Sequence, residues 1–180
     1  MVGTKLQYIL DANVFLEAYK RYYAFDLCPG FWQSLEYHAA QGILATIDRV
    51  GDELQEGPLL DEWKSQAPPL LFLDTDTADI LAAYGDIIRW AHEQARFTDA
   101  AKASFAEGVD AWLVAFAKAA GVTMVTHEAP APHSMKIVKI PDVCKAFDIT
   151  CKDSFVMLRE LHVSYYWDRP TTPPKNQSIP

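Results

Sequence analysis

Four acidic residues on four separate segments are the candidates for chemistry in this sequence. Asp11 directly follows one apolar run, and Glu128 follows another, "VTMVT" at residues 122–126. Glu53 and Asp110 lie on segments whose apolar spacing predicts helices. Carboxylates that lie within a few ångströms of one another cannot all stay ionised unless a cation lies among them. If these side chains converge, they are predicted to be catalytic acids that hold a metal ion.

The donor type narrows the choice of metal. Oxygen ligands without a cluster of cysteines or histidines favour Mg²⁺ or Mn²⁺. An ion of this kind activates water and neutralises the charge on a phosphodiester during in-line displacement. Asn13, Thr126 and His127 lie beside the acids in the sequence, and we expect them to orient the carboxylates of Asp11 and Glu128.

Each acid also has an ordinary structural explanation. Asp11 can cap the helix that follows it by accepting backbone N–H groups of the first turn. Glu53 flanks the apolar stripe of its segment, where a solvated surface acid is the usual outcome. Asp110 opens a predicted helix, where the helix dipole favours an acid, and residues 126–128 can be a plain surface loop. The local patterns leave both explanations open.

Apolar runs alternate along the chain with segments of helical spacing. The strand candidates are residues 5–11, 43–47, 70–74 and 122–126. The helix candidates are residues 13–20, 31–41, 48–57, 59–66, 77–94, 98–108, 109–121, 141–147 and 154–162. This alternation predicts an α/β fold, a three-layer α/β/α sandwich with a mostly parallel central sheet. In such sheets functional groups gather beyond the carboxyl ends of the strands, where Asp11 and Glu128 would lie.

The chain is acidic, which limits how it can bind a polyanion. It has 16 basic and 24 acidic residues among 180, a net charge of −8. A broad basic face that grips nucleic acid through its phosphates is therefore not expected. Divalent cations held by clustered carboxylates would supply the missing positive charge.

Composition also bears on compartment and domain organisation. No stretch has the length and apolarity of a membrane span, and no secretory signal pattern is visible, so we expect a cytoplasmic protein without membrane contact. Cys28, Cys144 and Cys151 lack the spacing of a disulfide framework or a thiolate zinc site, which favours reduced thiols. One domain is predicted over residues 1–165, with a polar, proline-rich flexible tail at 166–180.

The segment "YKRYYAFDLCPGFW" at residues 19–32 mixes cations with aromatic rings, as sites that stack single-stranded bases do. Its alternative is a structured loop whose aromatic rings pack on the core. The candidates for substrate binding are Lys20, Arg21, Tyr22, Tyr23 and Trp32.

A second acidic motif points to different chemistry. "LLFLDTDTAD" resembles the DxDxT motif of haloacid dehalogenase-like phosphatases, with Asp74 as the nucleophile and Asp76 as its partner. No convincing downstream partner residues accompany it. We expect instead that Asp74 starts a turn and that Asp76 or Thr77 caps the next helix.

The order of "LDANVF", "VGDEL", "VDAWLVAFA" and "VTHE" resembles that of the PIN-domain nucleases. "RYYAFDLCPGFW" and "IPDVC" are similar to a bacterial branch of PIN-like proteins of uncharacterised function, and the resemblance covers about residues 6–162. It implies a parallel α/β/α sandwich and RNA cleavage dependent on Mg²⁺ or Mn²⁺.

By position, Asp11, Glu53 and Asp110 match the core acids of the PIN-domain nucleases. Glu128 stands at or one step beyond the fourth acid, and Ala12 replaces a frequent serine or threonine. Many members of that family are toxins blocked by a small antitoxin, so the resemblance implies RNA and an antitoxin as partners. A second copy of the chain, in a homodimer, is a further candidate partner. A non-catalytic PIN-like module that binds RNA or protein is the alternative function.

Overall fold

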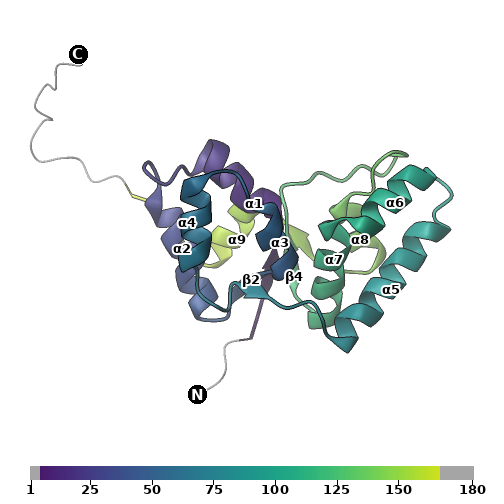
Figure 1. The fold of residues 1–180 in the computed structure, drawn as a ribbon, viewed down its shortest axis with the longest axis horizontal. Helices are drawn as coiled ribbons and strands as arrows, with labels where there is room; N and C mark the ends of the chain where they lie inside the picture. Colours follow the sequence, from purple (N-terminus) through teal and green to yellow (C-terminus); the bar gives the residue numbers. More distant parts are fainter. Residues whose placement is uncertain (1–4, 167–180) are drawn as a thin grey trace, which may run out of the picture.

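The computed structural model describes residues 5–166, which form a central sheet with helices on both faces (Figure 1). The sheet has five strands in the order β3-β2-β1-β4-β5, and every pair of neighbours is parallel. The strands are β1 (Tyr8–Leu10), β2 (Leu44–Ile47), β3 (Phe72–Leu73), β4 (Thr123–Val125) and β5 (Cys151–Lys152). The predicted α/β/α sandwich is therefore confirmed.

Helices connect successive strands and cover the sheet. Figure 1 shows α2, α4 and α9 on one side of the sheet and α5, α6 and α7 on the other. The helices are α1 (Ala12–Glu17), α2 (Pro29–Ala40), α3 (Asp48–Glu53), α4 (Pro58–Gln66), α5 (Ala78–Glu93), α6 (Asp99–Glu107), α7 (Val109–Ala120), α8 (Ile140–Ala146) and α9 (Ser154–Glu160).

Strand β1 lies at the centre of the sheet, between β2 and β4. All three of its residues are buried, as expected for a strand with neighbours on both edges and helices on both faces. Helix α7 ends at Gly121, whose left-handed backbone (φ 65°) favours glycine and reverses the chain into β4. Because α7 runs antiparallel to β4, its first turn lies near the carboxyl edge of the sheet.

Two helices differ from the predicted boundaries. The helix predicted over residues 48–57 ends at Glu53, because the ammonium group of Lys64 donates to the Gly51 carbonyl (2.8 Å) and the buried Leu54 leaves the helical conformation. The helix predicted over residues 13–20 changes after α1 into a π-helix over Ala18–Tyr22. Short π-helical segments are rare and frequently lie at functional sites.

One of the two shortest strands escaped prediction. Strand β5 contains only two residues, and it is defined by pairing with β4 rather than by a pattern of its own. Cys144 is buried, whereas Cys28 and Cys151 are half-buried, and all three are free thiols. Apart from Tyr166, the tail predicted at residues 166–180 lies outside the described residues.

Candidate functional site

The site lies where the strand order reverses at the centre of the sheet. The chain leaves β1 at Asp11 and β4 at Thr126, while β1 connects in sequence to β2 on its other side. Ligands of open parallel sheets bind beyond the carboxyl ends of the strands at this switch point. Asp11 and the residues that follow β4 therefore occupy the favoured position for chemistry.

Asp11 is buried and does not cap α1. Its side chain is 5% exposed and makes no cap hydrogen bond, and Val14 donates instead to the backbone carbonyl of Asp11 (3.1 Å). The Asp11 carboxylate oxygen Oδ2 accepts a hydrogen bond from the Thr126 hydroxyl (2.7 Å). The helix-cap explanation is therefore wrong, and the carboxylate faces the end of β4.

Thr126 holds the polar groups around Asp11 together. Its hydroxyl accepts hydrogen bonds from the Asn13 amide group (2.9 Å) and from the backbone N–H of Glu128 (3.0 Å). The Asn13 amide oxygen in turn accepts from the backbone N–H of His127 (3.0 Å). Asn13 and Thr126 thus join the ends of β1 and β4 and fix the direction of the Asp11 side chain.

The acids perturb one another. Burial raises the pKa of Asp11 to about 7, and the charges of Asp110 and Glu128 act in the same direction, against the lowering effect of the Thr126 hydrogen bond. Burial, followed by the charges of Glu128 and Glu53, raises the pKa of Asp110 to about 6. Partial desolvation also raises the pKa of Glu53, the last residue of α3, although that residue is exposed to solvent. The four predicted acids therefore lie in one electrostatic neighbourhood.

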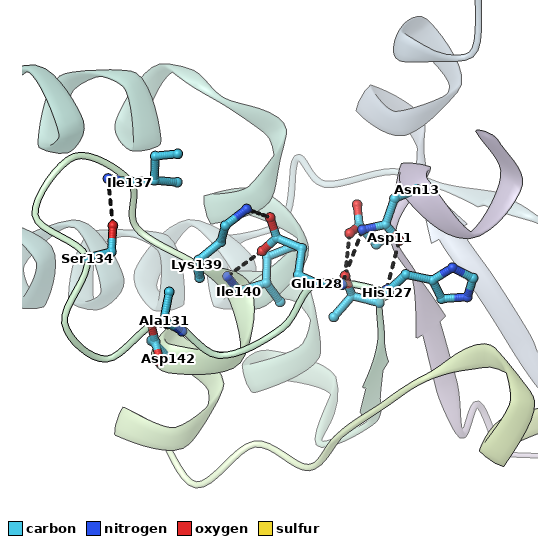
Figure 2. A network of polar contacts seen from close by, with 11 residues as sticks. Asp11, Asn13, His127, Glu128, Ala131, Ser134, Ile137, Lys139, Ile140 and Asp142 are labelled. Carbon is cyan, nitrogen blue, oxygen red and sulfur yellow. Dashed lines mark hydrogen bonds and ion pairs between the residues drawn. The ribbon is translucent and has the colours of Figure 1, made fainter. Parts of the chain in front are cut away.

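Glu128 has partners of its own. Figure 2 shows its carboxylate turned toward Lys139 and Ile140, away from Asp11. One oxygen pairs with the Lys139 ammonium (2.5 Å), and the other accepts from the backbone N–H of Ile140 (2.9 Å). Within residues 5–166, no three acidic, histidine or cysteine side chains converge as a ready group of metal ligands. Lys139 is a site residue that local sequence patterns did not reveal, because the chain between it and Glu128 is an irregular loop.

His127 lies at the outer side of this network. Its Nε2 is 2.7 Å from the Ser154 hydroxyl, and its ring stacks on Phe155 with centroids 5.9 Å apart. Burial lowers the pKa of His127, although the charges of Asp153 and Glu17 act in the opposite direction. The imidazole is therefore held in position by its neighbours and favours the neutral form at neutral pH.

A pocket of about 330 Å³ opens beside the acids. It is lined by Asn13, Glu17, Arg21, Tyr22, His127 and Glu128. Tyr22 is 53% exposed and meets His127 edge to face, with centroids 6.3 Å apart. Arg21 pairs with Glu17 (3.2 Å), and Lys20 pairs with Glu56 (2.8 Å). Arg21 and Tyr22, two of the residues predicted to bind substrate, thus line this pocket at the end of the π-helix.

Two other predicted substrate contacts belong to the core. Trp32 is 2% exposed, and its indole N–H donates to the carbonyl of Tyr23 (2.8 Å). Tyr23 stacks on the buried Phe31 with ring centroids 4.3 Å apart. The expectation that Trp32 stacks a base is wrong, because its ring is enclosed; Tyr23 is half-buried and mainly packs the π-helix onto α2.

The phosphatase-like motif forms an ordinary turn. The Asp74 carboxylate accepts the backbone N–H of Asp76 (2.8 Å), and the Thr77 hydroxyl caps α5 by accepting from Ile80. The expected turn and cap are confirmed. A separate cavity of about 480 Å³ lies at the amino ends of the strands, beside Gln7 and Thr123, away from the acids.

A family model described as a domain of unknown function, DUF4411, matches residues 8–165. The chain belongs to the DUF4411 family. No curated protein and no solved structure matches it. The match to DUF4411 spans the whole sheet and all the acids of the site. None of the helices within residues 5–166 combines the length and apolarity needed to cross a membrane.

The raised pKa of Asp11 predicts how stability depends on pH. Folding raises this pKa from 3.8 to about 7, so the folded chain binds the proton more tightly, and the resulting stabilisation is lost as pH rises through about 7. In EDTA, wild type should lose about 3 kcal/mol relative to Asp11→Asn between about pH 5 and about pH 8. Urea unfolding at several pH values measures this difference.

The matched control is Asp99→Asn, an exposed acid in the first turn of α6. Its stability should follow that of wild type across the same pH range. If the stabilities of wild type and Asp11→Asn change in parallel with pH, the pKa of the buried Asp11 carboxylate is not raised as described.

Proposed function

We propose that this protein is a metal-dependent endoribonuclease that hydrolyses RNA phosphodiester bonds. The observation that carries the proposal is the buried Asp11 carboxylate at the switch point, surrounded by further acids that raise its pKa. Burying an ionised carboxylate among like charges is costly unless a cation compensates it. The resemblance to PIN-domain nucleases, carried by the same four acids, supports the RNA substrate.

The donor set fits Mg²⁺ or Mn²⁺ in part. Asp11 and Asp110 offer carboxylate oxygens, the ligands that such hard cations prefer, and both have pKa values that a nearby cation would lower. Glu128 would join them after leaving Lys139, and Glu53 lies close enough to Asp110 to act on its charge. When bound, the ion would activate water and stabilise charge on the phosphodiester.

The other residues of the site would position the Asp11 carboxylate and the RNA substrate. Thr126 and Asn13 hold the Asp11 carboxylate at the carboxyl edge through the hydrogen bonds described above. Tyr22 presents an exposed aromatic ring at the pocket beside Asn13, and Arg21 supplies a cation there. Aromatic rings and cations at a groove are the groups that hold unpaired bases and the RNA backbone.

We extend the proposal to the toxin of a toxin–antitoxin pair in the cytoplasm, which rests on the resemblance alone. A small antitoxin would then cover the acids. Expression of the wild-type chain in a bacterial host should slow growth, whereas Asp11→Asn at equal protein levels should not, because cleavage is lost. Growth curves with matched immunoblots measure this, and equal slowing by both chains would contradict a toxin that acts by cleavage.

A non-catalytic RNA-binding protein is the second candidate. The Lys139–Glu128 ion pair favours it, because a lysine already supplies positive charge beside the acids and the carboxylates do not converge as a ready ligand set. The two candidates differ in whether a divalent cation binds and whether bound RNA is cut.

Metal binding and RNA cleavage are the decisive measurements. Mn²⁺ should raise the unfolding temperature of wild type by several degrees, because a ligand that binds only the folded state stabilises it. Wild type should then cut single-stranded RNA, and Asp11→Asn and Asp110→Asn should lose at least about a hundredfold in rate. Asp99→Asn, which removes the same charge from the first turn of α6, should keep full activity.

Three outcomes separate the candidates. A Mn²⁺ shift together with cleavage supports the nuclease. RNA binding with neither a Mn²⁺ shift nor cleavage supports the non-catalytic module. If wild type neither binds nor cuts RNA, both candidate functions are wrong.

The Lys139–Glu128 pair gives an independent test of the acids. In EDTA, Lys139→Met should cost about 2 kcal/mol, since the Glu128 carboxylate, whose side chain is 16% exposed, loses its charged partner. Mn²⁺ should restore much of that loss if Glu128 then turns to the metal. Urea unfolding with and without Mn²⁺ measures both effects.

Lys118→Met is the matched control, because Lys118 is similarly exposed and pairs with Asp86 near the other end of α7. Its loss of stability should not respond to Mn²⁺. A response of both variants to the same extent would refute the role given to Glu128.

A further inference from the structure

Three side chains form a layered stack at the junction of α3, α5 and α7. The guanidinium carbon of Arg49 lies 4.1 Å from the centre of the Trp112 ring, and the Tyr84 ring lies 4.0 Å from the same centre at an interplanar angle of 17°. One face of an indole cannot hold both groups at these distances. Tyr84 and Arg49 therefore cover opposite faces of Trp112, and Arg49 is the outermost layer.

Arg49 is anchored along one edge only. Its Nε donates to the hydroxyl of the buried Thr75 (3.1 Å), and that hydroxyl donates to Asp48 (3.1 Å). Arg49 itself is exposed, and within residues 5–166 no carboxylate forms an ion pair with it. The guanidinium plane is thus held in a fixed direction while its outer face and terminal nitrogens face solvent.

The stack adjoins the acids. Arg49 precedes Glu53 by one turn of α3, and Trp112 follows Asp110 by two residues on α7. The charge of Glu53 raises the pKa of Asp110, so these two ends of the helices lie near each other. Arg49 thus lies on α3, a different flank of the acids from the pocket formed by Arg21 and Tyr22.

We propose that Arg49 is a second RNA contact: an unpaired base stacks on the outer face of its guanidinium group, and its terminal nitrogens bind a phosphate. This inference rests on the proposed function for the identity of the ligand, and it adds a residue that binds the substrate. A base that stacks on arginine must be unpaired, so the substrate is single-stranded RNA. Trp112 and Tyr84 orient the arginine and do not touch the base.

The chemistry of arginine favours this role over a purely structural one. A planar guanidinium group stacks and donates paired hydrogen bonds to phosphate at the same time, which a lysine cannot do. An arginine needed only to join α3 to α7 would gain from a carboxylate partner at its open edge. The chain has a net charge of −8, and Arg49 is an exposed cation beside the acids that has no carboxylate partner within residues 5–166. Such a cation is suited to bind an anionic ligand.

The test measures binding of a fluorescent single-stranded oligoribonucleotide in Mn²⁺, in the Asp11→Asn background so that the RNA stays intact. Arg49→Ala should weaken binding about tenfold and reduce the salt dependence of binding, as expected when one stacking and one phosphate contact are lost. Arg49→Lys should keep most of the salt dependence but still bind several-fold more weakly. Thermal unfolding shows whether each variant is folded.

Arg89→Ala is the matched control, since Arg89 is an exposed arginine on α5 that pairs with Asp86. Its binding should equal that of the parent. If Arg49→Ala binds like Arg89→Ala, the inference about Arg49 is wrong while the ribonuclease proposal stands. If the parent binds duplex and single-stranded RNA with equal affinity, base stacking on Arg49 is wrong. If neither the parent nor wild type binds RNA, both the Arg49 inference and the ribonuclease proposal are wrong.

Discussion

The buried carboxylate of Asp11 is the constraint on which the rest of the site depends. The central position of β1 removes Asp11 from water, and its backbone N–H donates to the carbonyl of Val125 (2.9 Å) at the end of β4. The Thr126 hydroxyl and the backbone N–H of Ala12 stabilise the ionised side chain, while Asp110 and Glu128 oppose it. Such an arrangement costs folding free energy, so its place at the switch point of the sheet is more readily explained by chemistry than by stability.

On the proposed function, the topology of the sheet would let an acidic chain bind a polyanion. The acids are confined to the carboxyl edge, where β1 and β4 end and α3 and α7 place Glu53 and Asp110. Exposed cations and aromatic rings lie on two flanks of that edge. Arg21 and Tyr22 belong to the π-helix, and Arg49 belongs to α3. On the proposed function, these residues would supply positive charge locally, and RNA binding would not need a broad basic face.

Sequence patterns predicted the layers of the fold more reliably than the directions in which side chains turn. Continuous apolar runs identified β1 and β4, because strands buried on both faces leave that signature. The two-residue β5 has no such pattern. Trp32 was misassigned because a run of cations and aromatic rings does not reveal which rings turn inward. Lys139 could not be matched to Glu128, since an irregular loop rather than a helical or strand period brings them together.

The Lys139–Glu128 pair separates the two candidate functions. A lysine that fully compensated the acids would leave their pKa values near normal. Lys139 does lower the pKa of Asp110, yet that pKa remains at about 6 and that of Asp11 at about 7. One ammonium group therefore neutralises Glu128 but leaves the two more buried carboxylates without compensation. A divalent cation between Asp11 and Asp110 would meet that need, and it would also replace the charge of Lys139 beside Glu128. This unmet charge favours the metal-dependent enzyme over the non-catalytic module.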